Sequence, residues 1–182
     1  MVSGGDAHAG DHVENVTDPK TGLPVYSLHG KTRRPTPEML KDIDALVYDI
    51  QDIGCRSFTY ISTMGLAMQA AAENNIEFIV LDRPNPLGGL KVEGGLVDDN
   101  FISFVSQFKI PYVYGLTCGG ELALLLNGEN MLDKQCKLQV VKMKGWKRKM
   151  IYEQTGLQWI PSSPSYSTTG FSCVLSRIGY IG

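Results

Sequence analysis

The sequence predicts an α/β fold, with a mostly parallel sheet and flanking helices. Two apolar runs, at 45–50 and 77–81, stop abruptly in polar residues and are short enough to be buried strands. Between them, residues 60–73 repeat apolar side chains at helical spacing, which indicates an amphipathic helix. A strand, a helix and a strand in this order form a parallel, right-handed unit by default, so we expect the two strands to lie side by side.

The chain before this unit is rich in turn residues. Residues 24–28 could form a short strand. Thr36 is placed to cap a helix, with Pro37 as its first residue and Ile43 on its apolar face. We therefore expect this helix to lead into the first strand of the unit.

The chain after the unit begins with a long loop at 84–100, which is rich in Pro, Gly and Asp and is of a length that often carries function. We then expect a short strand at 111–114, a helix that Thr117 caps and that stops near 127–128, and a strand at 138–143. The remaining segment, 165–182, lacks periodicity and predicts poor order. Residues 1–164 are therefore expected to form one domain, and 165–182 a tail.

The composition is that of an ordinary globular domain of 182 residues with a net charge of −2. Nothing resembles a basic stripe, which argues against nucleic acid as a partner. The sequence shows neither a membrane-spanning run nor a signal peptide, so the chain expressed as given is expected in the cytoplasm. The 4 cysteines form no CxxC pair, and His8 and His12 lack firm ligand spacing, so we expect no metal site.

Polar side chains follow both apolar runs of the central unit. Asp49 lies near the end of the first run, and Gln51, Asp52 and Arg56 come after it. The second run is followed by Asp82, Arg83 and Asn85. In an open α/β sheet, ligands bind in the crevice beyond the carboxyl ends of the strands. If the strands are parallel neighbours, both polar groups open into one cleft.

The carboxylates in this cleft suit acid–base chemistry. Glycosidic bond cleavage typically uses two carboxyl groups, one as acid and one as base or nucleophile, and requires no cofactor. We predict Asp49, Asp52 and Asp82 as the catalytic candidates. The predicted substrate-binding residues are polar or aromatic side chains near these acids or farther along the chain: Gln51, Arg56, Tyr60, Arg83, Asn85, Glu93 and Glu121.

A structural interpretation stays open for the same residues. Asp49 or Asp82 could cap a helix or pair with Arg56 or Arg83, as strand-end acids of α/β folds often do. The two arginines could also fork onto a ligand carboxylate, or could pair internally with Asp52 or Asp82. Spacing alone favours the structural roles of Asp49 and Asp82.

Several long words of this sequence resemble the NamZ-type exo-β-N-acetylmuramidases, which are bacterial glycosidases. The words include TGLPVYSLHGKTRRPTPEML, DALVYDIQDIGCRSFTYISTMGLAMQAAAE, FIVLDRPNPLGG, GLTCGGELA and GWKR. The resemblance implies a Rossmann-like domain followed by a smaller domain, with the site in a cleft between them. It also implies release of N-acetylmuramic acid from the non-reducing end of peptidoglycan fragments, in the periplasm or outside the cell, with muramic-acid saccharides as partners.

The chain departs from the family pattern at both ends. Family members usually carry a PEHGFRG word just before the segment that matches Gly5–Gly10, and its glutamate is a leading candidate for a catalytic acid. Here Met1–Gly4 stands in its place, and the family pattern stops after Pro164. We therefore expect a chain truncated at both ends, whose own enzymatic activity stays open. The alternative hypothesis is a non-catalytic carbohydrate-binding or scaffold module derived from the same fold.

Overall fold

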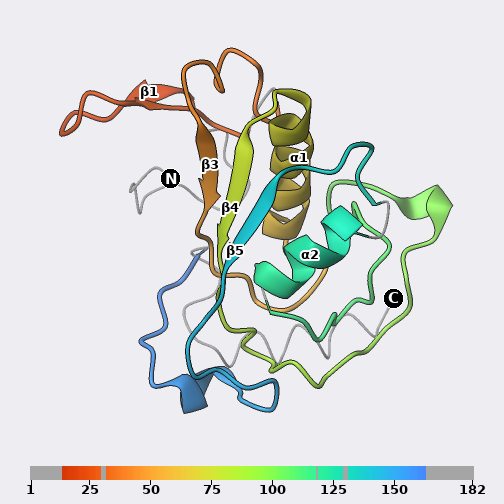
Figure 1. Cartoon of the computed structure of the whole chain (residues 1–182). Helices are drawn as coiled ribbons and strands as arrows, with labels where there is room; N and C mark the ends of the chain where they lie inside the picture. The colour runs from red at the N-terminus through yellow and green to blue at the C-terminus, as the bar shows by residue number, and fades with distance from the viewer. Residues whose placement is uncertain (1–13, 30–31, 118, 129–130, 163–182) are drawn as a thin grey trace.

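The computed structural model describes residues 14–29, 32–117, 119–128 and 131–162 (Figure 1). At its centre lies a three-stranded parallel sheet in the order β3-β4-β5. Its strands and the two helices that pack on it are β3 (Ala45–Tyr48), α1 (Tyr60–Glu73), β4 (Glu77–Leu81), α2 (Gly120–Gly128) and β5 (Leu138–Val141). The predicted α/β fold with a parallel sheet is confirmed.

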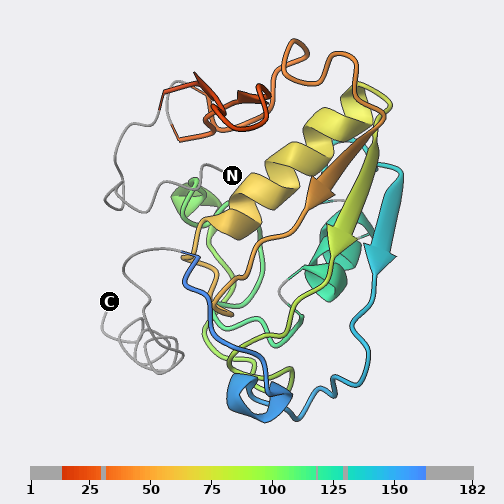
Figure 2. The same cartoon turned by 90° about the vertical axis from the view of Figure 1, so that its left-hand side faces the viewer.

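Both helices lie on the same side of the sheet. Figures 1 and 2 show α1 and α2 beside one another on one face of the strands, and the two helices contact each other. Phe78 and Val80 of β4 point to this side and are fully buried, as are Met64 of α1 and Leu122 of α2. The core therefore lies between the sheet and one helical layer.

Short elements surround this centre. An antiparallel pair of two-residue strands, β1 (Val16–Thr17) and β2 (Pro24–Val25), precedes the sheet. Two 3-10 turns, η1 (Asp99–Phe101) and η2 (Tyr152–Thr155), lie in the long connections. The strand expected at 111–114 is reduced to bridges from Val113 to Cys55 and Glu93.

The helix predicted to begin at Thr36 is wrong, because residues 37–42 form turns instead. The Leu40 backbone amide donates to the Thr36 carbonyl at 3.2 Å, so a first helical turn does form. Asp42 then takes a left-handed conformation with φ of 64°, which ends the turn before a second one can follow. Ile43, expected on the apolar face, is exposed.

The other predicted elements are present, although the strand expected at 24–28 covers only Pro24–Val25. The expected bounds of α1 and β4 are those observed, whereas the strands expected at 45–50 and 138–143 end two residues earlier, at Tyr48 and Val141. None of the helices in the described part of the chain is long and apolar enough to cross a membrane. The predicted tail falls within 163–182, outside the described residues.

Candidate functional site

Asp49 and Arg83 meet at the edge of the sheet where β3 and β4 both end. The Arg83 side chain donates from Nε to Asp49 Oδ1 at 2.7 Å, and its Nη2 lies 2.6 Å from the same oxygen. The Asp49 side chain remains 45% exposed and the Arg83 side chain 39% exposed. The structure thus brings together one member of each polar group that follows the strands, and it presents this acid–guanidinium pair to solvent.

Asp52 is a fully buried acid just below this edge. Its Oδ1 accepts hydrogen bonds from the Gly54 amide at 2.8 Å and from the Tyr114 hydroxyl at 2.5 Å. Desolvation raises the pKa of the Asp52 carboxyl to about 7, although the hydrogen bonds from Tyr114 and Gly54 oppose the shift. Asp52 therefore carries a proton near neutrality, but its side chain is 0% exposed and cannot reach a ligand as the chain is folded.

Asp82 lies at the start of α2. Its Oδ1 accepts from the Gly120 amide at 2.6 Å and from the Arg83 amide at 2.9 Å. A carboxylate at this position satisfies a free backbone donor and interacts favourably with the helix dipole. Asp82 therefore has the capping role that the structural interpretation described, and Asp49 has the pairing role.

Arg56 holds loop backbone together. Its Nη1 donates to the Gly95 carbonyl at 2.9 Å and also to the Ile110 carbonyl, while Nε donates to Ser106 Oγ at 3.2 Å. Desolvation lowers the pKa of its guanidinium. These contacts join three segments of the 95–110 region. The sequence left open an internal pair of Arg56 with Asp52 or Asp82, and Arg56 does not form that pair among the described residues.

Gln51 and Asn85 are buried amides with structural partners. Gln51 Nε2 donates to the Pro84 carbonyl at 2.9 Å, and Asn85 Nδ2 donates to the Leu116 carbonyl at 2.9 Å. Asn85 Oδ1 also accepts from the Leu87 amide at 2.9 Å. Both side chains tie the polypeptide beyond β4 to other loops, and neither is exposed to solvent.

The three remaining candidates are Tyr60, Glu93 and Glu121, and each contacts residues other than Asp49 and Arg83. Tyr60 donates its hydroxyl to the Ser162 carbonyl at 3.1 Å, and desolvation raises its pKa. Glu93 pairs with Lys91 at 3.3 Å. Glu121 accepts from Arg148 at 2.9 and 3.0 Å. Each candidate thus already has a partner within the chain.

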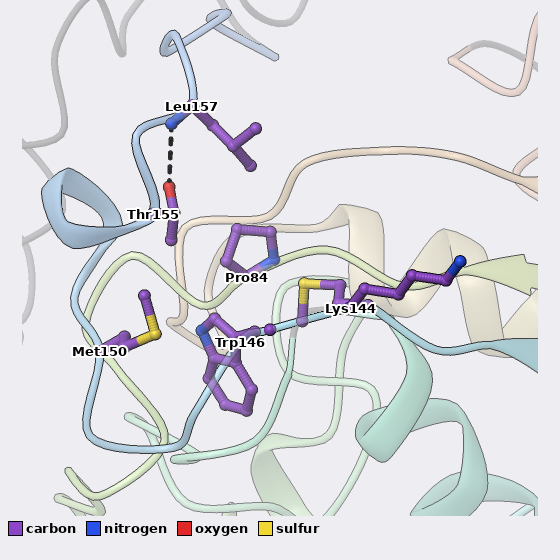
Figure 3. Close-up of a pocket in the computed structure, with 8 residues that line it drawn as sticks. Pro84, Lys144, Trp146, Met150, Thr155 and Leu157 are labelled. Carbon is purple, nitrogen blue, oxygen red and sulfur yellow. Dashed lines mark hydrogen bonds between the residues drawn. The ribbon is translucent and has the colours of Figure 1, made fainter.

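The structure also holds a pocket that the sequence reasoning missed. Its cavity volume is about 360 Å³, and Figure 3 shows its lining residues, which come from the start of the loop after β4 and from the segment after β5. The lining residues are Pro84, Met143, Lys144, Gly145, Trp146, Met150, Thr155 and Leu157. The signal that could have found it is Trp146 within GWKR, a large aromatic side chain among basic residues.

The chain matches one family model and several known proteins. Residues 3–170 match the model described as "Exo-beta-N-acetylmuramidase NamZ, N-terminal". The chain is similar to the "Peptidoglycan beta-N-acetylmuramidase NamZ" of Bacillus subtilis strain 168, with 52% identity over 97% of this chain and 42% of that protein.

Two crystal structures of DUF1343 family proteins from Bacteroides fragilis NCTC 9343 are also similar. One has a TM-score of 0.83 and 78% identity, over 86% of this chain and 40% of that chain. The other has a TM-score of 0.68 and 39% identity, over 74% of this chain and 37% of that chain. The chain therefore spans about two fifths of the length of these relatives.

Proposed function

Because the chain belongs to the NamZ exo-β-N-acetylmuramidase family, we propose that it supplies the sugar-binding edge of a glycoside hydrolase that acts on peptidoglycan fragments. The reaction is release of N-acetylmuramic acid from the non-reducing end of these fragments. The observation that carries the proposal is the Asp49–Arg83 pair, which is exposed at the carboxyl ends of two neighbouring parallel strands. The site of action is the cell wall, where this substrate is found.

Arg83 is the group that we assign to the muramic acid itself. Muramic acid differs from glucosamine by a lactyl ether that carries a carboxylate, and a guanidinium binds a carboxylate through two parallel hydrogen bonds. In the free chain, Asp49 occupies Nε and Nη2 of Arg83. A substrate carboxylate would replace Asp49 there and release it to accept hydrogen bonds from sugar hydroxyls.

Asp49 is the predicted catalytic carboxylate that the structure exposes most clearly. Asp52 is buried and Asp82 caps α2, so we assign to these two acids the positioning of the loops after β3 and β4. Glycoside hydrolysis generally needs a second carboxyl group on the opposite side of the scissile bond. Of the three predicted catalytic aspartates, Asp49 is therefore the one that we assign to substrate.

A test separates binding from catalysis. We expect N-acetylmuramic acid to bind the chain more tightly than N-acetylglucosamine, because only the former carries the lactyl carboxylate. Arg83→Gln should lower the affinity for N-acetylmuramic acid about tenfold, the cost of losing charged hydrogen bonds. Lys41→Gln is the matched control, because it removes an exposed cation from the turn before β3, at the other end of that strand. Calorimetric titration measures the affinity of the unmodified chain for each sugar and the affinity of each variant for N-acetylmuramic acid.

Turnover is measured with an aryl N-acetyl-β-muramide. If the chain hydrolyses this substrate and Asp49→Asn abolishes the hydrolysis, the result supports a catalytic role for Asp49. Equal binding of the two sugars, unchanged by Arg83→Gln, would overturn the proposal.

A non-catalytic carbohydrate-binding module is the second candidate, and the contacts of the predicted residues favour it. Gln51, Arg56, Asp82 and Asn85 all bind backbone groups of the chain itself. A site built in this way holds a rigid surface but offers few free acids. Arg83-dependent binding without hydrolysis of the aryl glycoside would support this candidate over the enzyme.

A further inference from the structure

The pocket beyond β4 and β5 contains a hydrogen-bond donor without an acceptor. Trp146 Nε1 is buried, and among the described residues no acceptor lies within hydrogen-bond reach of it. A buried donor without an acceptor has lost its hydrogen bond to water, so a native site that retains one calls for an explanation. A ligand that supplies an acceptor at this point would replace that hydrogen bond.

The rest of the pocket is mainly apolar. Pro84, Met143, Met150 and Leu157 line it together with the indole ring. The hydroxyl of Thr155 is already used, because it donates to the Tyr152 carbonyl at 2.6 Å and accepts from the Leu157 amide at 3.2 Å. Among the described residues, Trp146 Nε1 is therefore the buried side-chain donor of this mainly apolar lining that lacks an acceptor, which fits a small group with one carbonyl oxygen and a methyl.

The charge next to the pocket does not point into it. Figure 3 shows the Lys144 side chain extending away from Trp146, whereas the indole nitrogen lies on the side of its ring toward Pro84 and Met150. We therefore assign no anion to this pocket. The flexible thioether of Met150 can move to admit a ligand group to the nitrogen.

Trp146 is held in place by the loop after β4. A methyl group added at Gly89 would come within 3.0 Å of Trp146 Cη2 and 3.2 Å of Arg148 Cα, so only glycine leaves room for the ring there. The Gly89 amide donates to the Arg148 carbonyl at 2.6 Å, and Arg148 Nη2 donates to the Gly115 carbonyl at 2.7 Å. The indole is thus fixed before any ligand arrives, which lowers the entropic cost of binding.

We propose that this pocket, which we call the Trp146 pocket, binds the N-acetyl group of an amino sugar. The acetyl carbonyl accepts the hydrogen bond from Trp146 Nε1, and the acetyl methyl packs against Met143, Met150 and Pro84. The choice of an acetylated sugar rests on the proposed function, but the pocket's chemistry is separate from that of Arg83. Arg83 binds the lactyl carboxylate, and the Trp146 pocket binds the acetamide.

The test uses the indole N–H signals of the 182-residue chain in ¹H–¹⁵N correlation spectra. The chain contains 2 tryptophans, and Trp159→Phe assigns the two signals. We titrate with N-acetylmuramic acid, muramic acid and N-acetylglucosamine. The two acetylated sugars should shift the Trp146 signal downfield, and muramic acid should leave it in place. Equal shifts of the Trp146 signal with N-acetylmuramic acid and muramic acid, or no shift with any sugar, would overturn the inference.

Two variants make the test sharper. Trp146→Phe keeps an aromatic ring but removes the donor, and it should weaken binding of N-acetylglucosamine about fivefold, the loss expected for one neutral hydrogen bond. Lys41→Gln should leave that affinity unchanged, because this exposed lysine lies outside the pocket lining. The two proposals fail separately. Arg83-dependent binding with a silent Trp146 signal removes only the pocket, and an acetyl-dependent Trp146 shift without Arg83 dependence removes only the proposed function.

Discussion

Asp52 shows how a single residue can carry a pH dependence for the whole chain. Its ordinary pKa is 3.8, and burial raises the value in the folded chain to about 7. Between these two values the folded chain holds a proton on Asp52 that the unfolded chain has lost. The free energy of unfolding therefore falls as the pH rises through this window, and it stays lower above it.

We expect Asp52→Asn to remove this dependence, because asparagine is neutral at every pH and keeps an acceptor for the Gly54 amide. Between about pH 5 and about pH 8, the wild-type free energy of unfolding should fall by on the order of 2–3 kcal/mol more than that of the variant. Urea denaturation at the two pH values measures the difference. The control Asp133→Asn, which changes an exposed acid, should retain the wild-type behaviour. Identical pH dependence in Asp52→Asn and wild type would show that Asp52 is ionised in the folded chain.

The contacts of the site residues could be predicted from the sequence only where both partners lie at the ends of neighbouring strands. Asp49 and Arg83 meet because both directly follow neighbouring parallel strands, and apolar runs give those positions from sequence. The role of Asp82 depends on the Gly120 amide, and that of Arg56 on the Ile110 carbonyl. Both partners lie far along the chain, and no local pattern reveals which backbone group will arrive at a given side chain. Trp146 was missed for the same reason, because its surroundings come from two separate loops.

At the scale of elements, the periodicity of apolar residues predicts a helix or strand correctly where tertiary packing does not disturb that element. The helix at 60–73 and the strand at 77–81 were predicted with their observed bounds, because each buries a regular set of apolar positions against the other. The turn at 37–42 has a good capping residue in Thr36 but ends at the left-handed Asp42. Six residues are too few for a stable helix without a well-buried face, so the capping signal alone misled.

Helix α2 starts at a glycine because Asp82 leaves no room for a side chain. A methyl group added at Gly120 would lie 2.7 Å from both Asp82 Cγ and Val140 Cγ1. We expect Gly120→Ala to lower the free energy of unfolding by about 1–3 kcal/mol, since the contact forces the cap or β5 to move. At the other end of the same helix, Gly128 has open space around it. Gly128→Ala should therefore be neutral or stabilising by up to about 1 kcal/mol.

Thermal unfolding of these two variants separates close packing from helix propensity. Propensity alone predicts that alanine improves both positions, so only the contact with Asp82 makes Gly120→Ala worse. If Gly120→Ala raised the melting temperature as much as Gly128→Ala, the Asp82 cap would not be tightly packed against α2. The same variant tests the site, because Asp82 adjoins Arg83 and its displacement should also weaken sugar binding at that residue.

At the scale of the whole molecule, the helices of the described residues cover one face of the sheet. Parallel sheets usually have helices on both faces, and their strands are apolar on both sides for that reason. Here the helices of the described residues share one side (Figure 2). The strand register places Val47, Ile79, Leu81 and Val141 on the opposite face, together with Gln139. Val47 is 54% exposed and Val141 48%. An apolar face of this kind marks a surface for association.

We expect the chain to self-associate through this face as its concentration rises. Val47→Lys places a charge on β3, an edge strand of the sheet, and should weaken association about fivefold, since half of a valine side chain is worth about 1 kcal/mol when buried. Leu124→Lys is the matched control, because Leu124 is 51% exposed on α2, away from the sheet face, and the substitution adds the same charge. Sedimentation velocity across a concentration series measures both, and the melting temperature of each variant shows that it still folds. A wild-type chain that stays monomeric throughout, or an equal effect of the two substitutions, would show that the open face does not drive association.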